Sequence, residues 1–151
     1  MADSFYNLTY HLIWSTKNRT PWISEELQPR LWEYLAGISL QKNMKPLCIG
    51  GTFDHVHILV GLPPTMTVSQ AVQWLKGPSS KWLHETFGKE MGAFQWQDGY
   101  GAFTVSQSQV DDVFRYVKNQ KEHHRVKTFE EEFVGFLERN GIAWKKEYLL
   151  G

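Results

Sequence analysis

Two histidines separated by one residue are the first feature of this sequence that could do chemistry. They lie in segment 54–60, where apolar and polar residues alternate and the apolar residues are β-branched or leucine, which predicts a β-strand. Side chains two residues apart leave the same face of a strand, so His55 and His57 project together. Two neighbouring imidazoles can bind a divalent metal, and a strand with two half-exposed histidines is the alternative. The apolar side chains project the other way, toward a core: Val56, Ile58 and Val60.

A tyrosine and a glutamine four residues apart form a second candidate group. They lie in a helix predicted over residues 108–123. Tyr116 and Gln120 stack one turn apart beside the apolar stripe of that helix, where neither is required for the core. The alternative interpretation is a tyrosine at the boundary of the apolar face and a solvated glutamine. The stripe itself consists of Val110, Val113, Phe114 and Val117.

Together these two groups suggest a phosphoryl-transfer site. A divalent cation bound by His55, His57 and the amide oxygen of Gln120 would lie one helical turn from the Tyr116 hydroxyl. The cation would polarise a phosphate oxygen, and the tyrosine would attack phosphorus to form a covalent phosphotyrosine. The ordinary pKa of a phenol is about 10, so its deprotonation needs assistance. The sequence identifies no general base for this step.

Basic residues gather around the tyrosine in the window 115–127, and Glu122 is the only acidic residue within that window. This is the most basic window of the chain, and it is where a phosphate backbone is expected to bind. An ordinary solvated helix face is the alternative, and we interpret the acidic run at 130–132 as such a face. The candidate DNA-binding residues are Lys17, Arg19, Lys76, Lys81, Arg115, Lys118 and Arg125.

Four further histidines have no clear partner in the sequence. We predict surface positions for them: His11, His84, His123 and His124.

The composition bounds the class of protein. The chain has 151 residues, of which 42% are hydrophobic and 15% aromatic, so it is predicted to fold as a single domain over residues 1–151. Its net charge of zero argues against coating duplex DNA by bulk electrostatics, but not against a local basic groove. The single cysteine, Cys48, fits a reducing cytosol. We see neither a signal peptide nor an apolar run of the ~20 residues that a membrane span needs, so we expect a cytoplasmic protein without membrane contact.

The predicted elements alternate along the chain. Gly50-Gly51 suggests a bulge or a close backbone approach, and Gly77-Pro78 is expected to kink or interrupt a helix. Residues 88–99 are predicted to form a loop. The expected strands are 5–15, 46–53, 54–60 and 100–106, and the expected helices are 28–43, 67–87, 108–123 and 129–140.

This order, β-α-β-β-α-β followed by two helices, predicts an α+β fold of the ferredoxin-like type. Its core would span about residues 5–106, with an antiparallel sheet and two helices on one face. The 54–60 strand should form a hairpin with the strand before it, because almost no connector separates them. Many functions occur on such a sheet, so the fold does not decide the activity.

Three segments resemble one family in their order and spacing. They are Asp-His-Val-His-Ile-Leu-Val at 54–60, Leu-Lys-Gly-Pro-Ser-Ser at 75–80 and Tyr-Val-Lys-Asn-Gln at 116–120. The sequence resembles the small single-tyrosine transposases of bacterial insertion sequences, within the HUH single-strand endonuclease superfamily. Segments 10–17 and 129–133 are similar to that family too, so the resemblance covers nearly the whole chain. Pro78 departs from the pattern, since a basic residue is more usual there.

The resemblance implies a site and a reaction. His55, His57 and Gln120 would hold Mg²⁺ or Mn²⁺, and Tyr116 would be the nucleophile that leaves a 5′-phosphotyrosine and a free 3′-hydroxyl. It also implies a homodimer that binds single-stranded DNA hairpins at the ends of an element, in which the tyrosine helix can act in trans against the partner's histidines. A related branch is associated with repetitive extragenic palindromes.

A second hypothesis is a ferredoxin-like nucleic-acid-binding protein that acts on palindromic repeats without catalysis, or a domesticated relative that no longer cuts. It predicts hairpin binding that needs no metal, and no covalent adduct. The presence of both histidines, Tyr116 and Gln120 counts against it. For the dimer, the first strand could pair across a two-fold axis if it lies at a sheet edge.

Overall fold

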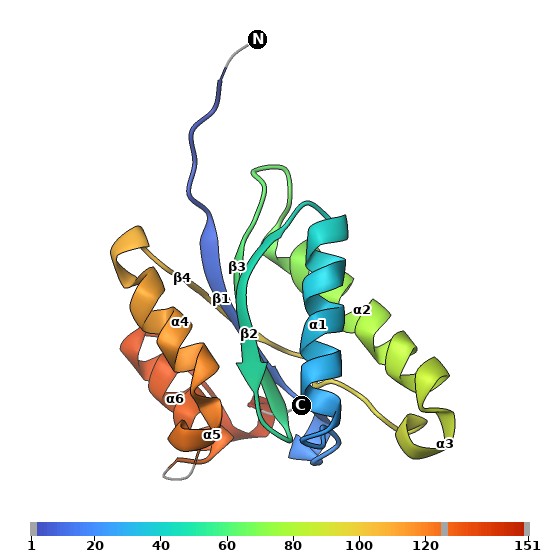
Figure 1. The fold of residues 1–151 in the computed structure, drawn as a ribbon. Coiled ribbons are helices and arrows are strands. Elements are labelled where there is room, and N and C mark those ends of the chain that lie inside the picture. The colour runs from blue at the N-terminus through green and yellow to red at the C-terminus, as the bar shows by residue number, and fades with distance from the viewer. Residues whose placement is uncertain (1–2, 125–126, 150–151) are drawn as a thin grey trace.

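A four-stranded antiparallel sheet forms the centre of the computed structural model, which describes residues 3–124 and 127–149. Its strands follow the spatial order β2-β3-β1-β4 (Figure 1). The predicted ferredoxin-like class is confirmed, and so is the hairpin of the two strands around residue 53. The strand bounds are β1 (Thr9–Ser15), β2 (Lys45–Gly51), β3 (His55–Gly61) and β4 (Gly101–Thr104).

Strand β1 is shorter than predicted and lies inside the sheet. It begins at Thr9 rather than at residue 5, and it pairs with β3 on one side and β4 on the other. Pairing of the first strand across a dimer axis is expected only if that strand lies at a sheet edge, and it does not. Its backbone groups already form hydrogen bonds with two neighbouring strands. The sheet edges are β2 and β4.

Helices α1 (Leu27–Gln41) and α2 (Val68–Thr86) cover one face of the sheet (Figure 1). The main core lies between this pair and the strands. As predicted, Val56, Ile58 and Val60 point into it from β3, and their burial leaves the opposite face of the strand to the histidines. The other core side chains with no exposed surface include Leu12, Trp14, Leu31, Leu35, Ala71 and Leu75.

Helix α2 runs through Pro78 without the expected interruption. A proline inside a helix removes one backbone hydrogen bond, but Leu75, Ser79 and Leu83 are buried around it and hold the helix against the sheet. At the start of α2, Thr67 forms a capping box with Gln70. The predicted loop that follows contains a short helix, α3 (Gly88–Met91), and two 3₁₀ turns occur elsewhere, η1 (Lys17–Arg19) and η3 (Lys146–Tyr148).

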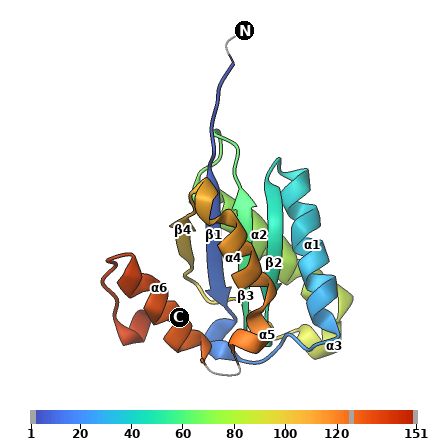
Figure 2. The same cartoon turned by 60° about the vertical axis from the view of Figure 1, so that its left-hand side comes forward.

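The second face of the sheet is covered by the C-terminal helices (Figure 2). After the turn η2 (Gln107–Gln109) these are α4 (Val110–Lys118), α5 (Gln120–His123) and α6 (Phe129–Arg139). The single helix predicted over 108–123 is broken at Asn119, whose φ of −100° and ψ of 31° are not helical. Val117 of α4 packs on Leu59, and α6 packs its phenylalanines on Ile13 and Phe103. In the described part of the chain, no helix is long and apolar enough to cross a membrane.

Gly50 of β2 allows α4 to approach the sheet closely. A Cβ atom built on it would lie 2.3 Å from the carbonyl oxygen of Val117, in the last turn of the tyrosine helix. The close backbone approach predicted for the Gly50-Gly51 pair is confirmed. The distance between β2 and Tyr116 therefore depends on the absence of a side chain at position 50.

We expect Gly50→Ala to lower the free energy of unfolding by about 1–3 kcal/mol, because the added methyl group must push the α4 backbone away. The matched control is Gly37→Ala in α1, where an added Cβ meets nothing within 4 Å. That variant should be about 0.5–1 kcal/mol more stable, as alanine favours a helix over glycine. Urea denaturation of both variants tests this, and a Gly50→Ala protein as stable as the parent would contradict it.

Candidate active site

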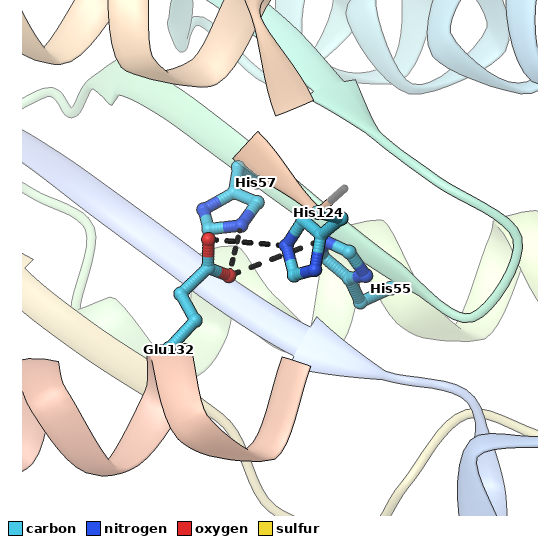
Figure 3. Close-up of side chains that lie close together, drawn as sticks. All are labelled: His55, His57, His124 and Glu132. Atoms are coloured by element: carbon cyan, nitrogen blue, oxygen red, sulfur yellow. Dashed lines mark hydrogen bonds and ion pairs between the residues drawn. The ribbon is translucent and has the colours of Figure 1, made fainter. Parts of the chain in front are cut away.

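The two histidines of β3 share one face of the strand, as predicted, and both are fully buried rather than half exposed. Their face is the one covered by α4, α5 and α6. Figure 3 shows His55 and His57 from the sheet pointing toward Glu132 from α6, with His124 beside them. The ligand atoms of these four residues all lie within 4.8 Å of one another.

His55 is held at both ring nitrogens. Its Nδ1 lies 2.8 Å from Oδ1 of Asp54 and 3.2 Å from the hydroxyl of Thr52. Its Nε2 lies 3.0 Å from Oε1 of Gln120. The ring is therefore fixed from the strand side, and Nε2 faces the centre of the cluster.

Gln120 is buried and not solvated, because the break at Asn119 turns it toward the sheet. Its amide nitrogen donates to the carbonyl oxygen of Tyr116 at 3.0 Å. This bond fixes the orientation of the amide, so that its oxygen, which is the atom able to bind a metal, faces His55. The one-turn spacing read from the sequence thus brings Gln120 to the histidine pair.

His57 contacts two residues that the sequence did not indicate. Its Nδ1 lies 2.8 Å from Nε2 of His11, and its Nε2 lies 2.8 Å from Oε1 of Glu132. The prediction of a surface position for His11 is wrong, since the ring is 2% exposed. Antiparallel pairing of β1 with β3 places Ile13 opposite His57, so His11 lies diagonally next to it on the same face.

The interpretation of the 130–132 run as a solvated face is wrong for Glu132. Helix α6 buries Phe129, Phe133 and Leu137, and position 132 falls on that same stripe. A carboxylate on the apolar stripe of a helix is the sequence signal that could have identified this residue.

The predictions of surface positions for the other histidines need correction too. His124 lies 3.1 Å from Oε2 of Glu132, and His123 lies 3.3 Å from the same oxygen. His84 is half-buried, with its Nε2 2.8 Å from the carbonyl oxygen of Phe94. These partners come from α6 and from the loop after α3, so helical or strand spacing does not reveal them.

Tyr116 points into the same cluster from α4. Its hydroxyl donates to Oε2 of Glu132 and lies 3.1 Å from Nε2 of His123. The ring centres of Tyr116 and His57 are 5.6 Å apart, so the tyrosine helix meets the histidine pair of its own chain. Burial raises the pKa of the Tyr116 phenol above its usual value, and the negative charge of Glu132 raises it further.

The charges of the cluster are coupled. Burial opposes ionisation of Glu132, but the charge of His57 and hydrogen bonds from His124 and His57 outweigh it and hold the pKa of the carboxyl well below its usual value. Burial lowers the pKa of His57 to about 4, against the opposing effect of Glu132. At neutral pH the carboxylate is therefore ionised while the His57 ring is neutral, as a metal ligand must be.

The donor set fits a divalent cation. A neutral imidazole donates from one nitrogen only, so a proton shared with Asp54 at Nδ1 leaves a lone pair on Nε2 of His55, facing the oxygen of Gln120. These two donor atoms, whose lone pairs face each other, would hold a divalent cation. Atoms bound to one Mg²⁺ at about 2.1 Å lie within about 4.2 Å of one another, and the cluster is only slightly wider than that.

The basic candidates do not form one surface. Arg19 is 3.9 Å from Asp54 and 4.0 Å from Glu130, so it lies beside the cluster, and Lys17 belongs to the same turn. Arg115 and Lys118 are exposed on α4. Arg125 lies outside the described residues.

The other two cations, Lys76 and Lys81, come from α2 on the opposite face of the sheet. The Lys76 ammonium donates to the carbonyl oxygens of Gln97 and Gly99 at 2.7 and 2.6 Å, so it fixes that loop. Lys81 is exposed, 3.9 Å from Glu85.

A cavity of about 550 Å³ opens beside the cluster. It is bordered by cations and by Phe53, which is 44% exposed. Its lining residues are Arg19, Pro21, Glu25, Thr52, Phe53, Asp54, Lys121, His124, Lys127, Thr128 and Phe129.

Comparison with known proteins identifies the family. The sequence family described as Transposase IS200 like matches residues 4–120, which is most of the chain. The chain belongs to this family. The family assignment drawn from the strand with His55 and His57 and from the tyrosine helix is thereby confirmed. The matched stretch ends at Gln120, before the helix that carries Glu132.

Individual relatives agree with this assignment. This chain is 29% identical over 130 residues to the transposase of insertion sequence element IS200 from Salmonella typhimurium. The alignment covers 83% of this chain and 85% of that one. It is 29% identical over 119 residues to the ISDra2 transposase TnpA of Deinococcus radiodurans, covering 76% and 85%.

Solved structures share the fold. A crystal structure from Deinococcus radiodurans, assigned as a transposase, superposes with a TM-score of 0.64 at 29% identity, covering 80% of this transposase and 95% of that chain. A REP-associated tyrosine transposase bound to a REP hairpin superposes with a TM-score of 0.55, covering 96% and 91%. At 16% identity this second likeness shows the fold alone.

The cluster makes the stability of the metal-free transposase depend on pH. His57 has a pKa of about 4 when folded and 6.5 as its ordinary value, so between these values the unfolded chain binds a proton that the folded chain does not. Stability is therefore full above pH 6.5 and is lost as the pH falls toward 4, by at most roughly 3 kcal/mol for this group. The lowered pKa of Glu132 adds a further loss below its ordinary value of 4.5.

Urea denaturation from pH 7 to pH 4 in the presence of a chelator measures this loss. His57→Gln should reduce the slope between pH 6.5 and 4, since it removes one titrating ring. Part of the slope should persist, because the pKa values of His11 and His123 are also lowered, mainly by burial. A parent profile without slope in that range would contradict the coupling.

Proposed function

We propose that this transposase cuts and rejoins single-stranded DNA through a covalent 5′-phosphotyrosine on Tyr116, with a divalent cation bound by His55, His57 and Gln120. One observation supports this most strongly. The Tyr116 hydroxyl and Nε2 of His57 both contact the Glu132 carboxylate within a single chain. Nε2 of His55 lies 3.9 Å from the same carboxylate and 3.0 Å from Oε1 of Gln120. A protein that only bound DNA would not need to bury such a set of groups.

The proposed cation is Mg²⁺ or Mn²⁺. Nε2 of His55, Nε2 of His57 and Oε1 of Gln120 would hold it, with Glu132 and His124 close enough to complete its coordination. When bound, such an ion supplies a positive charge that polarises a phosphate oxygen and stabilises the charge of the transition state.

The remaining steps belong to the side chains of the protein. The Tyr116 oxygen attacks phosphorus, an O–P bond forms, and the bond from phosphorus to the 3′-oxygen breaks with its electron pair on that oxygen. The hydrogen bond accepted by Oε2 of Glu132 orients the phenol. With its pKa held well below the usual value, this carboxyl is the weaker base, so Nε2 of His123, 3.1 Å from the hydroxyl, accepts the phenol proton as the O–P bond forms. The 3′-oxygen takes up a proton as it leaves, and the reverse sequence rejoins a strand.

The proposed substrate is single-stranded DNA that carries hairpins, at the ends of an element or in palindromic repeats. The family consists of transposases, and the related REP-associated tyrosine transposase is bound to a REP hairpin. An unpaired strand would reach Tyr116 past the cavity beside Arg19, where cations can neutralise phosphates and Phe53 can stack on a base. Contacts of Lys17, Arg115, Lys118 and Arg125 with DNA, and the homodimer, remain predictions.

We expect Tyr116→Phe to lower formation of the protein–DNA adduct at least about a thousand-fold, because the ring stays while the nucleophile is lost. Labelled hairpin strands from the DNA flanking the gene are incubated with protein and Mn²⁺, and the adduct is separated by denaturing electrophoresis. The matched control is Tyr148→Phe, which removes an exposed hydroxyl and should cut normally. Cutting by Tyr116→Phe at the parental position and rate would exclude this nucleophile, and tight binding without any adduct would favour the non-cutting alternative.

We expect Gln120→Leu to raise the Mn²⁺ concentration needed for half-maximal adduct formation at least about ten-fold, since it removes one ligand and keeps the buried volume. Excess Mn²⁺ should restore part of the activity. Gln107→Leu, at an exposed position, is the control. An unchanged Mn²⁺ requirement in Gln120→Leu would remove Gln120 from the ligand set.

A further inference from the structure

His11 is the buried side chain that the proposed reaction leaves without a role. It lies in β1 between strands β3 and β4, and its ring stacks on that of His57 with the ring centres 5.0 Å apart. On its other sides it meets the ring edges of Tyr116 and Phe136. A polar ring in such a place is expected to form a specific hydrogen bond.

The hydrogen bond of His11 is directed at one atom of the site. Its Nε2 lies 2.8 Å from Nδ1 of His57. Among the described residues, His11 is the hydrogen-bond partner of this nitrogen, while the opposite nitrogen of His57 faces Glu132 and the cluster. The bond therefore fixes the rotation of the His57 ring and directs Nε2 inward.

The two histidines of the pair are held in the same way. Each directs Nε2 toward the centre and presents Nδ1 to a fixed group, which is the carboxylate of Asp54 for His55 and the imidazole of His11 for His57. A histidine that binds a metal through Nε2 carries its proton on Nδ1 and needs an acceptor there. A neutral imidazole provides this acceptor without a second negative charge in a position as buried as residue 11.

We infer that His11 is a positioning residue: when a cation occupies Nε2 of His57, His11 accepts the Nδ1–H of that ring through its Nε2 and so holds His57 in the tautomer and orientation of a metal ligand. The inference rests on the proposed metal site. It assigns to His11 no contact with metal or DNA.

Two variants separate this role from simple packing. His11→Leu fills much of the space but offers no acceptor. His11→Gln offers an amide oxygen about where Nε2 of His11 lies, and so should restore the bond to His57. Mn²⁺ affinity is measured by calorimetry on the full chain without DNA, and thermal unfolding reports whether each variant is folded.

We expect His11→Leu to bind Mn²⁺ about 10–100-fold more weakly than the parent, and His11→Gln to recover most of the loss. In the parent with Mg²⁺, nitrogen NMR of the His57 ring should show the proton on Nδ1. Equal Mn²⁺ affinity of the parent and His11→Leu, or an equal loss in both variants, would overturn the role of His11 alone. A parent that binds no Mn²⁺ would instead overturn the metal site of the proposed function.

Discussion

The candidate site depends on the contacts of one buried group, the Glu132 carboxylate. It is buried between β3 and α6, and His57, His124 and Tyr116 all contact its oxygens. A buried charge without such partners would cost several kcal/mol, so these contacts and the position of α6 stabilise each other. Loss of the packing around α6 would therefore remove the contacts that Glu132 makes with Tyr116 and with His57.

The position of the nucleophile depends on backbone features far from it in sequence. Gly50 lets α4 approach β2, and the break at Asn119 turns the Gln120 side chain back onto the Tyr116 carbonyl. The helix, the strand and the amide are thus set relative to one another before any ligand binds. Such an arrangement is suited to a reaction in which a small displacement of the attacking oxygen lowers the rate strongly.

Much of this account could be predicted from local sequence patterns. Strand alternation gave the common face of His55 and His57, and element order gave the sheet and its helices. Local patterns could not place His11 or Glu132, because their partners depend on strand register and on the packing of α6. They also missed the break at Asn119, since periodicity extends across it, and they overestimated the effect of Pro78, which tertiary packing tolerates.

The central claim is that the tyrosine, the proposed metal ligands and Glu132 act together within one chain. The most direct measurement mixes the Tyr116→Phe protein with the His57→Ala protein and assays adduct formation on a hairpin strand. If the site assembles within one chain, neither protein has a complete site and the mixture should form no more adduct than each variant alone. Recovery toward about a quarter of the parental activity, the share of intact sites when two variants pair at random in a dimer, would contradict the claim. Such recovery requires the tyrosine of one chain to act beside the histidines of another.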